Sequence, residues 1–335
     1  SLVAITLEQG IESKNAEETH KSIKKILKNY ESERYTAYVA GFPTFLVIIA
    51  ESMRADLIRL IPFVVIILIG TLFLSFRSVG GVVLPTITVL ITTVCTLGLM
   101  ALFHVNLTLV ASAIPVLMIA VGSAYGIHII SHYFDEVDKE RLLKGEVSEE
   151  RNKEIIFHTL KRIGGAVLLA ALTTIAGFGS LATSSITLLR DFGIFAAIGV
   201  FIAFIIALTL IPSLLILRHK SLKHKVGLVK PKLDEPEKLD LITKTLFKIY
   251  NFLAKDKIKI FVLFFIILIV AVFGSMRIKI GNPMVNYFRK STEIRKADEF
   301  ANKNFNGTTM LSLIIKGEEP GALTRPDVLK VIDKM

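Results

Sequence analysis

Long apolar stretches separated by short polar segments dominate the middle of the chain. The most informative of them, residues 107–133, contains no Asp, Glu, Lys or Arg. Because a helix rises about 1.5 Å per residue, a stretch of this length crosses a hydrocarbon core of about 30 Å. The same pattern recurs along the chain and predicts a bundle of membrane helices. The expected spans are residues 60–76, 79–103, 107–133, 163–186, 192–217 and 260–276.

Polar segments precede and follow the spans. Residues 1–57 are expected to be the end of an aqueous domain, and residues 277–335 the start of another. Their patterns predict strands at 2–7, 35–40 and 310–316 and helices at 16–30 and 44–59. The bundle is expected over residues 58–217, followed by a basic linker at 218–259 and a last span at 260–276. The chain begins with Ser and ends in a helix-like stretch, so we expect it to be part of a longer protein.

The composition favours a membrane protein over a soluble domain. Hydrophobic residues make up 52% of the 335 residues, and the mean hydropathy is +0.60. The formal net charge of +11 comes from basic residues between the spans, without the interleaved aromatic residues of a nucleic-acid surface. Short basic segments stay on the cytoplasmic side of a membrane. Residues 134–162, which are charged and helix-like, and residues 218–259 are therefore expected inside, with both chain ends outside.

The third span carries small and polar residues that a helix facing only lipid would not need. Gly122 and Gly126 form a small-xxx-small pair, which lets a second helix approach closely. Tyr125 and His128 lie three positions apart, on one side of the helix. Together with Ser123 they are candidates to line a proton or substrate pathway. The alternative is a buried Tyr with a satisfied hydroxyl and a His at the membrane interface.

Two motifs resemble a known family. Residues 164–181 (GGAVLLAALTTIAGFGSL), followed by residues 189–195 (LRDFGIF), and residues 122–133 (GSAYGIHIISHY) are similar to the resistance-nodulation-division (RND) superfamily. The nearest branch is that of the hydrophobe exporters related to mycobacterial membrane protein large (MMPL). The resemblance implies a polytopic α-helical membrane protein of the RND fold. The six spans would be transmembrane helices two to seven of twelve, and the ends would be partial α/β porter domains in the periplasm.

The resemblance also implies a function. Members of the family typically use the proton gradient to move lipids or other hydrophobic and amphiphilic molecules outward from the inner (plasma) membrane of bacteria. Expected partners are membrane lipid, a hydrophobic substrate and the second half of the same polypeptide, against which Gly122 and Gly126 are expected to pack. A homo-oligomer is left open. We expect no nucleic-acid partner, cofactor or enzymatic activity, because no nucleotide loop, catalytic triad or metal cluster is recognisable.

Hydroxyl side chains in the first motif are further candidates. Thr173 and Thr174 either line the pathway or bond the backbone of their own helix, as hydroxyls in helices often do. Arg190 and Asp191 are expected to form an interfacial turn, with Asp191 as the N-cap of the helix that follows.

One position departs from the pattern of the family. Its proton-driven members carry an Asp just before the Tyr that corresponds to Tyr125, and here that residue is Ala124. No Asp, Glu, Lys or Arg lies in any of the expected spans. Histidine titrates near neutral pH, so His128 is the candidate substitute. Otherwise the proton carriers lie in the second half, or the protein is a non-transporting lipid sensor or scaffold. A metal pair of His128 and His132 lacks a recognisable third ligand.

Overall fold

The computed structural model describes residues 13–29, 38–39, 41–145, 147–217, 244–245, 247–251, 257–279, 281 and 284–305. The chain divides into two compact units, one of residues 1–50 with 269–335 and one of residues 51–268. Every regular element within the described residues is an α-helix or a 3₁₀-helix. Six of these helices are long and apolar enough to cross a membrane, which confirms the prediction of a polytopic helical membrane protein.

From α2 to α6 the helices of the second unit follow one another with short connections, and residues 218–256 separate α6 from α8. In chain order they are α2 (Phe42–Phe76, shared with the first unit), α3 (Val79–Leu102), η1 (Ala111–Ala113), α4 (Ile114–Lys144), α5 (Glu149–Gly179), η2 (Ser180–Thr183), α6 (Thr187–Leu217) and α8 (Lys257–Ser275, also shared). Arg77 ends α2 in the left-handed region, with φ of 46°, and the Ser78 hydroxyl accepts a hydrogen bond from the amide of Gly81 to cap α3. A tight turn therefore reverses the chain between α2 and α3.

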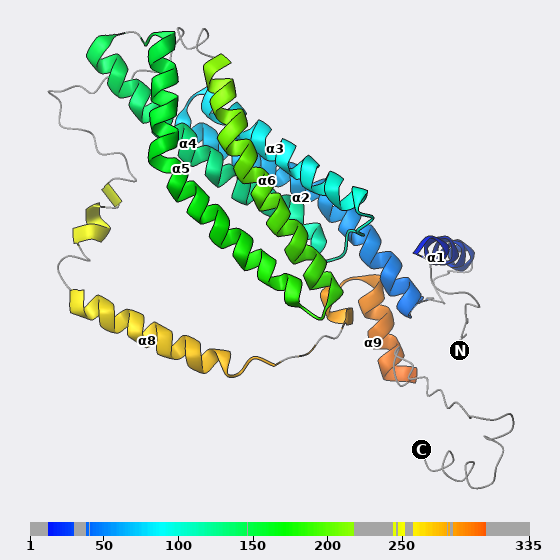
Figure 1. Ribbon diagram of the computed structural model, residues 1–335. Helices are drawn as coiled ribbons and strands as arrows, with labels where there is room; N and C mark the ends of the chain where they lie inside the picture. Colours follow the sequence, from blue (N-terminus) through cyan, green and yellow to red (C-terminus); the bar gives the residue numbers. More distant parts are fainter. Residues whose placement is uncertain are drawn as a thin grey trace, which may run out of the picture. The chain divides into compact units, whose positions relative to one another are not determined.

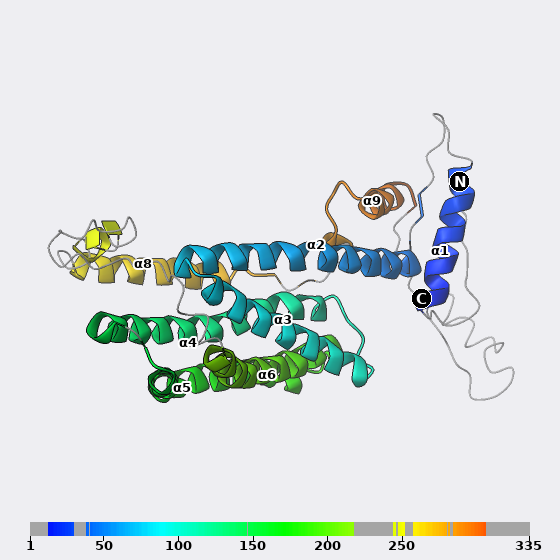
Figure 2. The same ribbon diagram turned by 90° about the horizontal axis from the view of Figure 1, so that it is seen from above.

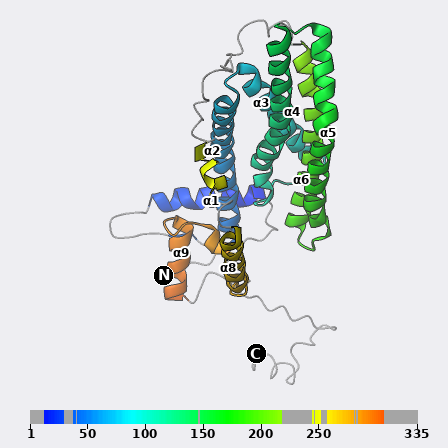
Figure 3. The ribbon, with the colours of Figure 1, turned by 90° about the vertical axis from the view of Figure 1, so that its left-hand side faces the viewer.

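Helices α4 and α6 form the centre of the bundle. They contact each other, and each of them contacts both α3 and α5, which flank this pair (Figure 1). Ile114, Met118, Val200 and Ile211 from the central helices are fully buried. The part of α2 in this unit lies beside α3 near the turn that joins them (Figures 2 and 3), and Leu72 packs in one apolar cluster with residues of α3 and α4.

Threonine hydroxyls line the buried side of α3 without breaking the helix. Thr88, Thr92, Thr93 and Thr96 are buried. Their hydroxyls donate to backbone carbonyl oxygens three or four residues earlier, at distances of 2.7–2.8 Å. Polar groups within a hydrocarbon layer must be satisfied by the protein itself, and these are satisfied by their own helix. On the outside of the bundle, large apolar side chains are exposed, as expected of a surface that faces lipid.

The charged segment at residues 134–162 is a helical hairpin. The apolar part of α4 ends near Tyr133, but the helix continues to Lys144, and α5 begins at Glu149, well before its apolar part. Gly145 ends α4 with φ of 82°, and the Ser148 hydroxyl caps α5 by accepting from the amide of Arg151 at 3.2 Å. Both membrane helices therefore extend past the apolar layer.

Two helix starts differ from the predictions. Residues 107–110 precede η1, so α4 begins at Ile114 and not at residue 107. Helix α6 begins at Thr187, which places Asp191 inside the helix; the prediction that Asp191 is its N-cap is wrong. The carboxylate instead lies 3.6 Å from Nε of Arg190, in an ion pair. The apolar pattern does not mark the helix ends: α6 starts about one turn before its apolar span, and α4 starts about two turns after the beginning of its own.

The first unit contains α1 (Ser13–Lys28), η4 (Met284–Tyr287) and α9 (Glu293–Phe305). Lys24 Nζ of α1 forms an ion pair of 2.7 Å with Glu293 Oε2 of α9. The rings of Phe45 and Phe288 meet edge to face, with their centroids 5.6 Å apart. The polar segments before the first span and after the last one thus contact each other. The strands predicted at 2–7, 35–40 and 310–316 lie outside the described residues except for 38–39, as does most of the linker at 218–259.

Candidate functional site

Gly122 and Gly126 allow α4 to approach two helices of its own bundle. A Cβ placed on Gly126 would lie 3.1 Å from Cβ of Pro85 in α3 and 3.4 Å from Cδ1 of Ile211 in α6. A Cβ on Gly122 would lie 3.3 Å from Cγ2 of Val89 in α3. The expectation that these glycines face a helix of a second half of the protein is therefore wrong, because α3 and α6 already occupy that side.

The Tyr125 side chain points into the bundle. It is 5% exposed, and its hydroxyl has no hydrogen-bond partner of good geometry among the described residues. The hydroxyl interacts with the side chain of Thr174 in α5. Thr174 donates its own proton to the carbonyl oxygen of Ala170 at 2.7 Å, so only its lone pairs are available to Tyr125. In a hydrogen bond between these two hydroxyls, Tyr125 would be the donor and Thr174 the acceptor.

His128 and Tyr125 differ in burial although they lie within one turn of each other on α4. His128 is exposed, as are Ala120 and Ala124 on the preceding turns, while Tyr125 is buried. The three exposed positions are four residues apart and form a stripe, which we call the open face of α4. The structure thus places His128 where another helix or water can reach it.

The remaining hydroxyl candidates are bonded within their own helices. Ser123 Oγ donates to the carbonyl oxygen of Ala120 at 2.9 Å, and Thr173 Oγ1 donates to that of Ala170 at 3.0 Å. Ser123 is buried and Thr173 is exposed. Both hydroxyls thus bond the backbone of their own helix, which is the alternative to lining a pathway. Within the described part of the chain, no group of three His, Cys, Asp or Glu side chains is arranged to hold a metal ion.

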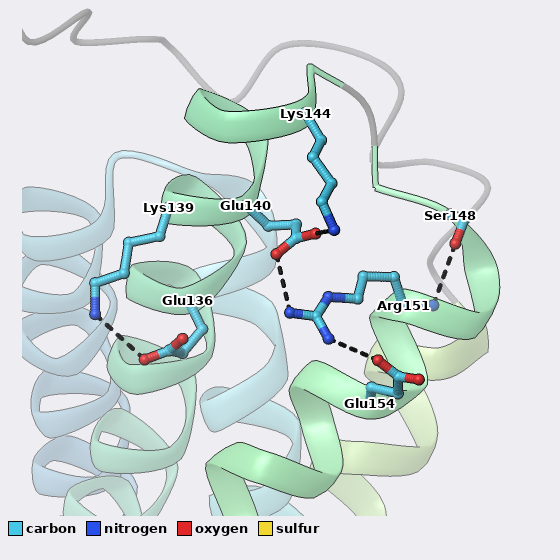
Figure 4. A network of polar contacts seen from close by, with 7 residues as sticks. All are labelled: Glu136, Lys139, Glu140, Lys144, Ser148, Arg151 and Glu154. Carbon is cyan, nitrogen blue, oxygen red and sulfur yellow. Dashed lines mark hydrogen bonds and ion pairs between the residues drawn. The ribbon is translucent and has the colours of Figure 1, made fainter.

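A network of charged side chains joins α4 and α5 beyond the apolar layer (Figure 4). The nearly buried carboxylate of Glu140 lies 3.0 Å from Nη2 of Arg151 and 3.1 Å from Nζ of Lys144. Arg151 also bonds Glu154 at 2.6 Å. These two cations, Arg151 first, hold the pKa of Glu140 below its ordinary value. Just below the network, the buried hydroxyl of Tyr133 donates to Oδ1 of Asn152 at 2.7 Å. The hairpin is therefore fixed by polar bonds between its two helices.

Two features of the bundle were not recognised from the sequence. A Cβ on Gly199 of α6 would lie 2.9 Å from Oγ1 of Thr96 and would also meet Met118. Gly199, Ala203 and Ala207 repeat a small residue every fourth position, the same signal that was recognised in α4. The pairing of Glu140 with Arg151 had no such signal, because it depends on how α4 and α5 come together.

Long apolar helices packed around a central pair, with charged side chains gathered beyond the apolar layer, define a multi-pass α-helical membrane protein. The model of the MMPL family matches residues 1–237. The chain belongs to this family, which confirms the resemblance to the RND superfamily stated above.

Three similar proteins have been described in other organisms. A putative membrane protein of Methanocaldococcus jannaschii is 28% identical over 159 residues, which are 48% of this chain and 38% of that protein. The probable transport protein MmpL4 of Mycobacterium leprae is 31% identical over 203 residues, 59% of this chain and 20% of that protein. The apo-petrobactin exporter of Bacillus anthracis is 31% identical over 172 residues, 49% of this chain and 21% of that protein. The aligned parts thus cover less than half of each relative.

Proposed function

We propose that the full-length protein is an RND-type secondary transporter that exports lipids or other hydrophobic or amphiphilic molecules. The observation that carries this proposal is the MMPL match over residues 1–237, which includes all of α2 to α6. The names of two relatives, a probable transport protein and an exporter, support it. Both come from bacteria, which favours the inner (plasma) membrane of a bacterium as the location.

The proposed arrangement is one of twelve transmembrane helices, of which α2 to α6 and α8 are the second to the seventh. The polar segments at 1–57 and 277–335 would belong to periplasmic porter domains, which accept and pass the cargo. The open face of α4 supports this arrangement, because Ala120, Ala124 and His128 are exposed on a helix whose other sides are buried. In the full-length protein this face would pack against a helix of the second half.

The proposed energy source is the proton gradient, with His128 as the titrating group of this half. The expected spans contain no Asp, Glu, Lys or Arg, and Ala124 stands where proton-driven relatives of the family carry Asp. A dry histidine stays neutral, since burial disfavours its charged form. The exposure of His128 supports the proposal, because water or a partner helix can reach an exposed side chain.

The second candidate function is that of a lipid sensor or scaffold that moves no cargo. Ala124 favours it, because an intramembrane carboxylate is the usual proton carrier and this half has none. Both candidates share the fold, so energised movement of a molecule is what separates them.

The export proposal is tested with the full-length protein in vesicles loaded with a lipophilic fluorescent dye. An imposed proton gradient should accelerate loss of dye from the membrane, and a protonophore should abolish the acceleration. Vesicles without protein are the control for passive leakage. Dye loss that is the same with and without the gradient would favour the sensor over the exporter.

A further inference from the structure

A cavity lies between α4 and α5, beyond the polar ends of their apolar spans. Its volume is about 260 Å³. The residues that line it are His132 and Glu136 of α4 and Arg151, Ile155, His158, Thr159 and Arg162 of α5. On α5 these residues recur every three or four positions and therefore share one face of the helix. The cavity belongs to the charged hairpin of α4 and α5.

The depth of this cavity matches the headgroup layer of a membrane. His132 lies one residue before the end of the apolar span of α4, and Arg162 lies one residue before the start of that of α5. The other lining residues follow on the side away from the apolar layer. One end of the cavity thus opens at the level where lipid tails give way to headgroups, and where Lys and Arg side chains commonly attract anionic lipid.

The cavity offers hydrogen-bond donors that the protein leaves unused. Thr159 is 3% exposed, and its Oγ1 has no hydrogen-bond partner. The Nε atom of Arg151 is also buried without a partner, although the two terminal nitrogens of Arg151 bond Glu140 and Glu154. A buried donor without an acceptor destabilises the protein. Two such donors, both on residues that line one cavity, favour a site for an acceptor-rich ligand.

The charges of the lining favour an anion. Two arginines line the cavity with one carboxylate, Glu136, and Arg162 is the arginine that is not held by Glu140 and Glu154. Glu136 Oε1 is 3.3 Å from both Lys139 Nζ and Arg162 Nη1, so it is shared between two cations at long range. The Arg162 side chain is 67% exposed, and its ion pair with Glu136 is the long contact of 3.3 Å. Arg162 can turn to an incoming anion at little cost.

We propose that this cavity binds the phosphate group of a phospholipid. The lipid would come from the membrane leaflet that adjoins the charged hairpin. A phosphate group supplies several strong acceptors, which suit the arginine fork, the unused Thr159 hydroxyl and the histidines. Pockets that enclose a whole drug-sized ligand measure about 300–1,000 Å³, so this smaller cavity suits a headgroup while the tails stay in the lipid. The proposal does not depend on export, because binding at this position requires no transport.

Binding is measured with purified full-length protein in detergent and fluorescently labelled phosphatidylglycerol, by fluorescence anisotropy. We expect Arg162→Gln to raise the dissociation constant about tenfold, since it removes a charge-assisted hydrogen bond. Thr159→Val should raise it about fivefold. Lys161→Gln is the matched control, because Lys161 is an exposed neighbour on α5 that does not line the cavity. Lys161→Gln should leave the dissociation constant within about twofold of the wild-type value.

A change in the opposite direction separates binding from folding damage. Glu136→Gln removes the anion that competes for Arg162, so it should tighten binding about threefold, which a misfolded protein would not do. Diacylglycerol, which lacks the phosphate, should not displace the labelled lipid. Displacement by inorganic phosphate at concentrations comparable to the lipid would support the phosphate site but assign it to a soluble ligand. Equal affinity of Arg162→Gln, Thr159→Val and the wild type would overturn the proposal.

Discussion

Single glycines set the distance between helices in the centre of the bundle. Gly126 faces Pro85, whose ring and backbone cannot move aside, whereas a Cβ on Gly98 of α3 would meet nothing within 4 Å. Both are helical glycines, so in both Gly→Ala should add about 1 kcal/mol of helix propensity. In Gly126→Ala we expect overpacking of about 1–3 kcal/mol to outweigh that gain.

The two variants are compared by thermal unfolding in detergent. Gly126→Ala should lower the unfolding temperature, and Gly98→Ala should leave it unchanged or raise it. A larger change, Gly126→Leu, should impair assembly far more than Leu117→Ile, which nearly conserves volume. Equal tolerance of Gly126→Ala and Gly98→Ala would show that α3 and α4 do not approach as closely as the structure has them.

The hydrogen bond between Tyr133 and Asn152 is the other residue-scale feature that can be tested. Both side chains are at most 1% exposed. Tyr133→Phe removes the donor and leaves Oδ1 of Asn152 buried without it, which should cost about 1–3 kcal/mol. Asn152→Leu alone should also destabilise, while the double variant should cost less than the sum, because it removes both polar groups together. Strictly additive effects of the two changes on unfolding would contradict a direct bond.

At the scale of elements, the hairpin of α4 and α5 should respond to acid. Arg151 and Lys144 lower the pKa of Glu140 from its ordinary value of 4.5. The ionised carboxylate therefore stabilises the hairpin at any pH above 4.5, and this contribution is lost as the pH falls through the lower pKa of the folded state. Hydrogen exchange of the amides near the hairpin turn should accelerate in that acidic range.

Two variants show whether Glu140 is the group responsible. Glu140→Gln should raise the exchange rate of the hairpin above the acidic range and remove most of its dependence on pH within it. Glu150→Gln is the control, because Glu150 is exposed at the start of the same hairpin helix. An unchanged acid response in Glu140→Gln would assign the effect to another carboxylate.

The elements also show how far the sequence leads and where it stops. Apolar runs predicted the six membrane helices, because burial in lipid requires apolar side chains along a whole span. They misplaced the start of α6 and treated residues 107–110 as part of α4, since hydropathy reports the lipid layer and not the helix ends.

Contacts between helices were the part that the sequence predicted least well. The spacing of Gly122 and Gly126 indicated a close approach but not that α3 and α6 are the neighbours. The spacing of Tyr125 and His128 did not indicate that Tyr125 is buried and His128 exposed. The cavity at Thr159 and Arg162 depends on how two helices pack, and a single sequence does not report that packing.

For the whole molecule, the account predicts a topology. Lys153 and Lys230 should face the cytoplasm, and Lys25 and Lys303 the outside, because short basic segments are retained inside. Single cysteines introduced at these positions, in a Cys95→Ser background, are labelled in intact cells with a membrane-impermeant maleimide. Labelling from outside should occur at positions 25 and 303. Labelling of position 153 or 230 from outside would contradict the predicted topology.

The central claim is that the full-length protein exports its cargo at the expense of the proton gradient, with His128 as the titrating group of this half. The most direct test measures gradient-driven dye export by the full-length wild type, His128→Gln and, as a control in the loop between α3 and η1, the exposed His104→Asn. We predict that His128→Gln lowers the rate of gradient-dependent export at least about tenfold, because Gln accepts no proton near neutral pH. His104→Asn should keep the wild-type rate. Full gradient-dependent export by His128→Gln would contradict the claim and place the proton carrier elsewhere in the protein.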